Sequence, residues 1–165
     1  MRQARSAVWL EGGAREAAHH LKYSGWRRAA QSMAASMRDL GPIRAGKDAC
    51  LLPIPLGRRR IRERGYNQSR EIASALSSLT GIPIRDQVLS RTRETRTQTA
   101  LTPEARHANV SGAFEAREAT GGRFILVDDV FTTGSTLLAA ATALAEAGAA
   151  CVEAVTFARA MLPVG

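Results

Sequence analysis

The chain has 165 residues, a length suited to one compact domain. Hydrophobic residues make up 45% of it, enough for a buried core, which excludes a disordered or collagen-like chain. Lysine and arginine number 23 against 15 aspartate and glutamate residues, a formal net charge of +8, so we expect either an anionic ligand or partner or a solvated basic surface.

The cysteines and the apolar segments predict a cytoplasmic protein. Cys50 and Cys151 lie far apart in strand-like surroundings, which favours reduced thiols over a disulfide framework or a zinc site. Residues 1–10 lack the apolar core of a signal peptide, and the longest apolar stretch, residues 137–157, contains Glu146 and Glu153. We therefore expect a chain that neither spans nor crosses a membrane.

The N-terminal quarter predicts two helices. Small or apolar residues recur at helical spacing between Gly12 and Leu40, with a break at Ser24 and Gly25. Our interpretation is an N-terminal helical extension over residues 1–41 and a core domain over residues 42–165. The core begins with a predicted buried strand over residues 49–55, and the basic segment of residues 57–65 follows it directly.

The remaining elements predict an α/β domain. A helix is expected over residues 66–79 and a strand over 84–89, and then a strand, a helix and a strand over 123–128, 135–147 and 151–158. The last three form a βαβ crossover, so the two strands should be parallel. The polar residues 90–112 lie between these groups, and a connection of that length is typical of a functional flap or a mobile segment.

The most informative segment is the end of the strand that begins at residue 123. Asp128 and Asp129 follow its apolar residues, and a hydroxyl-rich turn around Gly134 then opens a helix. Helix N-termini expose unpaired N–H groups, so residues 132–136 can bind a phosphate, while the acids can accept hydrogen bonds from sugar hydroxyls or hold Mg²⁺ through water. The alternative is a simple helix cap, which needs one hydroxyl residue. Successive strand residues point to opposite faces, which argues against a glycosidase-type acid pair.

The segment from Phe124 to Thr136 resembles the motif with which type I phosphoribosyltransferases bind 5-phosphoribosyl 1-diphosphate (PRPP). The resemblance implies a mostly parallel sheet flanked by helices, with Asp128 and Asp129 as catalytic residues that engage the ribose hydroxyls and hold Mg²⁺. Mg²⁺ then bridges pyrophosphate and ribose, and a nitrogen displaces pyrophosphate at C1 through an oxocarbenium-like transition state. The PRPP-binding residues that it implies are Val130, Phe131, Thr132, Thr133, Gly134, Ser135 and Thr136.

Further segments resemble ComF-type proteins, which are phosphoribosyltransferase-like and associated with DNA uptake in competent bacteria. These segments are LPIP at 52–55, RIRERGYNQ at 60–68 and QTAL at 98–101, and residues 21–25 resemble the helix pair ahead of that family's core. The fold places a pyrophosphate-binding loop after the first core strand, and the residues there are Leu56, Gly57, Arg58 and Arg59. It also places a hood over bound PRPP, for which the candidates are Arg91, Arg93, Arg96, Gln98 and Arg106.

The chain departs from these families in two ways. ComF-type proteins commonly carry a four-cysteine zinc element before the core; with two cysteines, this chain either lacks that element or begins after it. Enzymes that salvage 6-oxopurines place an aspartate at the position of Thr132, so hypoxanthine and guanine are disfavoured as acceptors.

Two functions are consistent with the sequence. The first is Mg²⁺-dependent transfer of phosphoribose to an unidentified nitrogenous acceptor. The second is a non-catalytic PRPP-binding or accessory protein in DNA uptake, with single-stranded DNA or competence proteins as partners. Aromatic residues make up only 5% of the chain, which argues against a dedicated single-strand binder. The resemblance also makes a homodimer an expectation.

Overall fold

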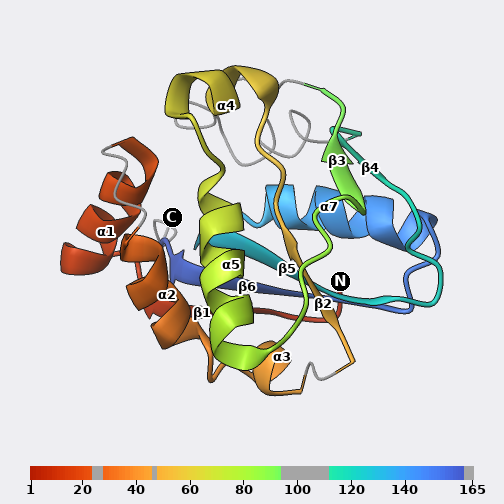
Figure 1. Cartoon of the computed structure of the whole chain (residues 1–165), viewed down its shortest axis with the longest axis horizontal. Coiled ribbons are helices and arrows are strands. Elements are labelled where there is room, and N and C mark those ends of the chain that lie inside the picture. The colour runs from red at the N-terminus through yellow and green to blue at the C-terminus, as the bar shows by residue number, and fades with distance from the viewer. Residues whose placement is uncertain (24–27, 46–47, 94–111, 162–165) are drawn as a thin grey trace.

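The computed structural model describes residues 1–23, 28–45, 48–93 and 112–161. Figure 1 shows the elements, and their bounds in chain order are β1 (Ala4–Trp9), α1 (Gly12–Tyr23), α2 (Ala29–Met37), α3 (Gly41–Arg44), β2 (Cys50–Pro53), α4 (Arg58–Arg64), α5 (Gln68–Thr80), β3 (Leu89–Arg91), β4 (Phe114–Ala116), β5 (Arg123–Phe131), α7 (Ser135–Glu146) and β6 (Cys151–Arg159).

A four-stranded parallel sheet forms the centre of the molecule, with the strand order β1-β6-β5-β2. Leu126 of β5 lies between Ala154 of β6 and Leu52 of β2 in the register. The predicted parallel relation of the strands on either side of α7 is confirmed. All four strands therefore end at the same edge of the sheet.

Helices cover both faces of this sheet. Helices α2 and α5 lie on the face in front in Figure 1, and α7 lies behind. Ile125 and Val127 belong to the core on the α2–α5 side, whereas Phe124 and Leu126 belong to the core on the α7 side. A central parallel strand buried on both faces needs apolar residues at consecutive positions, as β5 has. The mostly parallel sheet flanked by helices is thus confirmed.

The N-terminal residues differ from the expected helical extension. Helices α1 and α2 form as predicted, but residues 4–9 are the strand β1, which extends the central sheet beside β6. Ser6 Oγ lies 2.7 Å from Thr156 Oγ1, and the Leu10 amide donates to the Arg159 carbonyl at 2.8 Å. These residues thus contribute a strand to the sheet of the core, and the domain boundary near residue 41 stays a prediction.

The segment that follows α5 also differs from the expectation. Ile84 makes a single parallel bridge to Leu51, and the strand β3 begins only at Leu89. Strands β3 and β4 form an antiparallel ribbon, and the Thr92 amide donates to the Ala113 carbonyl at 3.0 Å. Three predicted hood residues, Arg96, Gln98 and Arg106, lie outside the described residues.

Two properties of the described ranges bear on membranes and on metals. None of the helices in these ranges has the length and apolar character that crossing a membrane requires. Within the same ranges, no group of three or more histidine, cysteine and acidic side chains is placed to hold a metal ion.

Candidate PRPP site

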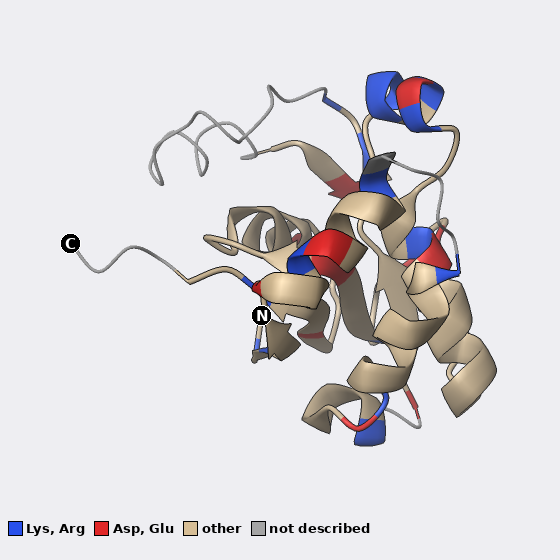
Figure 2. Ribbon diagram, turned by 90° about the vertical axis from the view of Figure 1, so that its left-hand side faces the viewer, with Lys and Arg blue, Asp and Glu red and all other residues tan. Residues whose placement is uncertain are grey.

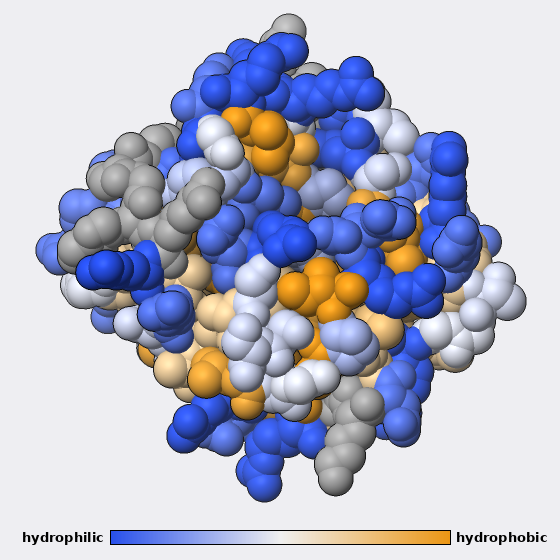
Figure 3. Space-filling model, viewed as in Figure 1, coloured by the Kyte–Doolittle hydropathy of each residue, from blue (hydrophilic) through white to orange (hydrophobic). Residues whose placement is uncertain are grey.

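A cavity of about 420 Å³ lies at the edge where the parallel strands end. Its walls come from α1, from the connection after β2, from α4 and α5, and from the end of β5 with the turn into α7. Figure 3 shows hydrophilic residues over α4 at the top of the molecule. Elements that are far apart in the sequence therefore share one site.

Asp128 and Asp129, called the acid pair below, line this cavity. Strand β5 continues past both residues to Phe131, so their backbone is fixed by the sheet. Ser69 Oγ donates to Asp128 Oδ1 at 2.7 Å, and Gln68 Nε2 makes a longer contact of 3.5 Å with Asp129 Oδ1. Both acids therefore meet consecutive residues at the start of α5.

Lys22 of α1 forms an ion pair with the acid pair. Its Nζ atom lies 2.5 Å from Asp129 Oδ2, and the side chains are 26% and 5% exposed. The preceding residue, Leu21, is fully buried, and the Tyr66 hydroxyl donates to its carbonyl. Packing and this hydrogen bond fix the last turn of α1, and hence the ammonium, beside Asp129.

The charges in the cavity shift two pKa values. Burial raises the pKa of Asp128 to about 7, and the neighbouring Asp129 charge adds to the rise, while Ser69 and Lys22 oppose it. The pKa of Lys22 lies above its ordinary value: burial lowers it, but the attraction of Asp129 and Asp128 outweighs that effect. Lys22 is therefore cationic at neutral pH, and Asp128 exchanges its proton near physiological pH.

The turn from Thr132 to Thr136, called the phosphate turn below, lies next to the acid pair. Gly134 has φ 76°, a left-handed conformation, and a Cβ atom there would lie 2.8 Å from Phe131 Cζ. The hydroxyls of Thr133 and Ser135 are 2.8 Å apart. The predicted PRPP-binding residues that line the cavity are Val130, Phe131, Thr132, Gly134, Ser135 and Thr136. Thr133 is not among the lining residues. The start of α7 thus lines a ligand-sized space.

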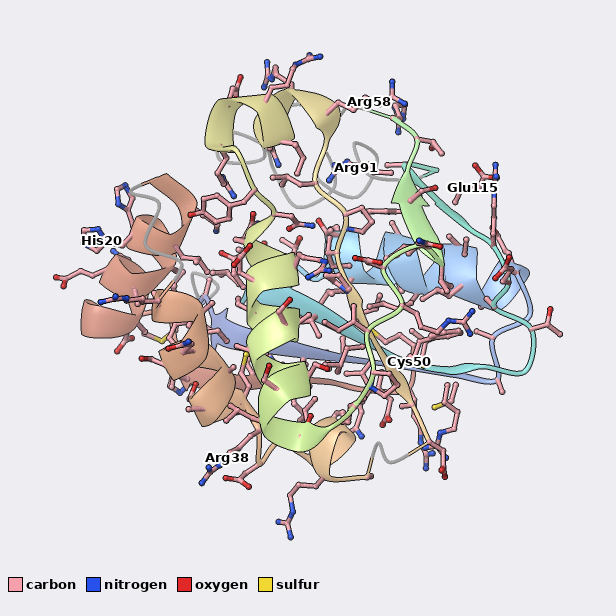
Figure 4. All side chains as sticks on the ribbon, viewed as in Figure 1. His20, Arg38, Cys50, Arg58, Arg91 and Glu115 are labelled. Carbon is pink, nitrogen blue, oxygen red and sulfur yellow. The ribbon has the colours of Figure 1, made fainter. Side chains whose placement is uncertain are left out.

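The basic segment after β2 forms the helix α4 and divides its arginines between two faces. Arg60 and Arg64 are half-buried and line the cavity, because residues four apart share one face of a helix. Arg58 and Arg59 are exposed and are not among the lining residues, and Figure 4 shows Arg58 at the first turn of α4. Of the predicted pyrophosphate-loop residues, Leu56 lines the cavity and Gly57 immediately precedes α4.

The residues from Arg64 to Gln68 connect α4 to α5 and position the acid pair. Arg64 Nη1 donates to Gln68 Oε1 at 2.5 Å, and Gly65 ends α4 with φ 79°. Asn67 caps α5 by accepting from the Ser69 amide at 3.0 Å, and its Nδ2 donates to the Ile54 carbonyl at 2.9 Å. This segment therefore fixes the residues that contact both aspartates.

Two predicted hood residues are described, and they differ in position. Arg91 lines the cavity, contacts the Pro55 carbonyl at 3.5 Å and lies over the Phe114 ring at 5.3 Å. Arg93 is exposed and is not among the lining residues. The base of the β3–β4 ribbon therefore supplies one arginine to the site.

Sequence reasoning assigned no role to several residues of the site: Lys22, Arg60, Arg64, Gln68 and Ser69. Each of the first four lies in a segment that resembles ComF-type proteins, so the resemblance marked their positions without giving their partners. Lys22 and Asp129 are 107 positions apart in the sequence, and only the fold brings them together.

A parallel sheet with an acid pair and a phosphate turn at the carboxyl ends of its strands defines the phosphoribosyltransferase class of α/β proteins. The family model described as "Phosphoribosyl transferase domain" matches residues 61–162. The chain belongs to this family, and its relatives place it in the ComF-type group.

Three known proteins illustrate the similarity. The DNA utilization protein YhgH of Escherichia coli (strain K12) is 38% identical over 104 residues, 62% of this chain and 46% of that protein. Competence protein ComFC of Bacillus subtilis (strain 168) is 35% identical over 117 residues, 68% of this chain and 45% of that protein. A solved orotate phosphoribosyltransferase of Mycobacterium tuberculosis in complex with PRPP is 21% identical, covers 89% of this chain and 76% of that one, and gives a TM-score of 0.46. The chain spans about half the length of the curated relatives that it matches.

Proposed function

We propose that the cavity binds PRPP and that the chain transfers its phosphoribosyl group to a nitrogenous acceptor. The observation that carries this proposal is the convergence of the acid pair, the phosphate turn and the arginines Arg60 and Arg64 on one cavity. The phosphate turn would hold the 5-phosphate, the acid pair the ribose hydroxyls, and the arginines the pyrophosphate, whose charge matches their planar donors.

The chemistry would depend on charge placed around the ribose. The acid pair would accept hydrogen bonds from the hydroxyls and face the positive charge that develops at the ring as pyrophosphate departs. Arg60 and Arg64 would stabilise the negative charge that collects on the leaving group. The cavity walls would limit the access of water, which competes with the acceptor for C1.

The acid pair also fits a Mg²⁺ ion. This ion prefers oxygen ligands and is commonly held by one or two carboxylates together with substrate phosphates and water. Asp129 Oδ2 is paired with Lys22, so Asp128 is the better placed of the two to hold the metal. When bound, Mg²⁺ would neutralise part of the charge of the pyrophosphate.

Thermal unfolding with PRPP and Mg²⁺ tests the binding. A ligand at about a hundred times its Kd adds roughly 2.7 kcal/mol to stability, so the melting temperature should rise by several degrees. The double variant Asp128→Asn, Asp129→Asn should fold and show no such rise. Arg38→Met, which removes an arginine from an exposed ion pair with Asp39, is the control and should keep the shift. The absence of a shift in the parent protein contradicts PRPP binding.

Release of pyrophosphate across a panel of nucleobases and amines tests the catalysis. We expect release with at least one acceptor, and we expect it to fall together with PRPP binding in the double variant. Retained PRPP binding without release from any acceptor would instead favour a protein that binds PRPP as a signal.

A second candidate function is contact with single-stranded DNA. The outward face of α4 carries the exposed residues Arg58, Arg59 and Arg62, and Figure 2 shows this basic helix at one end of the molecule. The names of the relatives, "DNA utilization protein" and "Competence protein", favour a role near DNA. Affinity for a labelled oligonucleotide should fall steeply as salt rises if backbone contacts dominate, and a weak, flat response contradicts the idea.

A further inference from the structure

Lys22 is a charged residue of the cavity to which the proposed function gives no role. It comes from α1, before the core strand β2, yet its Nζ atom reaches the buried carboxylate of Asp129 at 2.5 Å. A lysine that is only 26% exposed loses hydration and side-chain freedom when it is held in this way. Such a placement calls for a compensating role.

We propose that Lys22 is a positioning residue for ribose recognition, and that its ammonium holds the Asp129 carboxylate in the orientation that the ribose hydroxyls require. The proposal rests on the proposed function, because it assigns Asp129 to the ribose of PRPP. Lys22 acts through Asp129 and is given no contact with the ligand.

Asp129 is a buried carboxylate with a second carboxylate beside it. This residue is 3% exposed, and the second carboxylate, Asp128, is its neighbour along β5. A buried polar side chain is stable in one orientation only when its atoms have partners nearby. Lys22 supplies a partner for one oxygen, Oδ2, and leaves Oδ1 toward Gln68.

The end of α1 that carries Lys22 is held rigidly by its neighbours. Leu21 is fully buried in the core that α2 and α5 share, and its carbonyl accepts a hydrogen bond from the Tyr66 hydroxyl. Tyr66 lies between Gly65, which ends α4, and Asn67, which caps α5. The segment that positions Gln68 and Ser69 on the acids therefore also positions Lys22.

The contacts of Asp129 belong to a network that joins four elements. Contacts run from Arg64 through Gln68 to Asp129 and from there to Lys22, across α4, α5, β5 and α1. Asp129 is thus held from two sides, with the amide of Gln68 near one oxygen and the ammonium of Lys22 on the other. Loss of the ammonium removes the contact that holds Oδ2, which leaves the carboxylate free to rotate away from the ribose position.

Two ligands separate the effect on the ribose from an effect on the phosphate turn. Ribose 5-phosphate carries the hydroxyls and the phosphate, whereas inorganic phosphate carries only the group that the phosphate turn would hold. We expect Lys22→Met to weaken the binding of ribose 5-phosphate by about tenfold or more in calorimetry. A tenfold change in Kd corresponds to about 1.4 kcal/mol. Inorganic phosphate should bind as it does to the parent protein.

Two further variants test the mechanism. Lys22→Arg keeps the charge and should recover most of the affinity for ribose 5-phosphate. In an Asp129→Asn background, Lys22→Met should have little further effect, because the two residues act as a unit. Arg38→Met, at an exposed ion pair outside the cavity lining, is the matched control for loss of a cation and should leave both affinities unchanged.

The outcomes distinguish this inference from the proposed function. If the parent protein binds neither PRPP nor ribose 5-phosphate, the proposed function fails and the inference fails with it. If the parent binds both and Lys22→Met binds ribose 5-phosphate equally well, only the inference is overturned. Equal losses for ribose 5-phosphate and inorganic phosphate also overturn it, because they place the effect of Lys22 in the phosphate turn or in the fold.

Discussion

Asp128 illustrates how a single side chain can favour a binding site at the expense of stability. Its carboxyl lies beside Asp129 in surroundings that raise its pKa to about 7, with burial as the largest cause. Folding therefore favours the protonated form, and ionising this residue in the folded protein costs free energy. A cationic ligand or a metal would offset that cost when it binds, because it stabilises the ionised carboxylate.

This raised pKa predicts how Asp128→Asn changes stability with pH. The folded protein binds more protons than the unfolded chain between the ordinary carboxyl pKa and about 7, so Asp128 lowers the stability of the parent as pH rises through this window. The variant should unfold at a higher temperature than the parent at pH 8, and the difference should disappear toward pH 4. Melting curves of the two proteins from pH 4 to pH 8 measure it, and a difference that does not depend on pH would contradict the assignment.

Gly134 sets the shape of the phosphate turn. A side chain there would be strained by the positive φ and would meet the Phe131 ring at 2.8 Å. Gly134→Ala should cost about 1–2 kcal/mol for the left-handed backbone alone and should weaken binding of inorganic phosphate. Denaturant unfolding and calorimetry check the two effects. Gly121→Ala has a comparable φ of 69° and nothing within 4 Å of the added atom, so it should lose stability and keep phosphate binding.

At the scale of elements, α4 separates arginines for the ligand from arginines for the solvent. Arg60→Met should weaken the binding of PRPP and leave the affinity for ribose 5-phosphate unchanged, because only PRPP carries the pyrophosphate. Arg62→Met, on the same helix but exposed and outside the lining, should change neither affinity. Competition binding with both ligands measures this. A loss of PRPP affinity in Arg58→Met would instead favour the assignment made from the sequence.

The helices show what could be predicted from the sequence and what could not. The apolar periodicity between Gly12 and Leu40 predicted α1 and α2, and the apolar run before Asp128 predicted most of β5. The sides on which Arg58 and Arg60 lie could not be predicted, because this requires knowing that a helix begins at Arg58 and which of its faces packs on the core. Likewise, no local pattern indicates that Lys22 pairs with Asp129.

Strand β1 was missed for a related reason. It lies at the edge of the sheet, and Val8 and Trp9 are exposed, so its residues show neither a continuous apolar run nor a regular alternation. Its main contribution is backbone pairing with β6, which any sequence without proline can make. Edge strands of this kind are therefore difficult to predict from the amino-acid sequence.

At the scale of the whole molecule, β1 predicts that the N-terminal residues are needed for stability. Removal of residues 1–10 would expose β6 and leave Thr156, which is 1% exposed, without its contact to Ser6. We expect a large fall in the melting temperature, of at least several degrees, with weaker PRPP binding because α1 loses its anchor. Calorimetric melting of the truncated chain is the measurement. Ser6→Ala, which keeps the strand, should have a much smaller effect.

The hydrogen bond that joins Thr92 to Ala113 at the end of the β3–β4 ribbon has a consequence for divergence among homologues. The chain departs from the ribbon and returns to it at neighbouring points, so insertions between these two residues need not disturb the register of any strand. For a flexible connection between two fixed points, each doubling of length costs only about 0.6 kcal/mol. We therefore expect homologues to tolerate insertions between Thr92 and Ala113 while keeping the arrangement of the central strands.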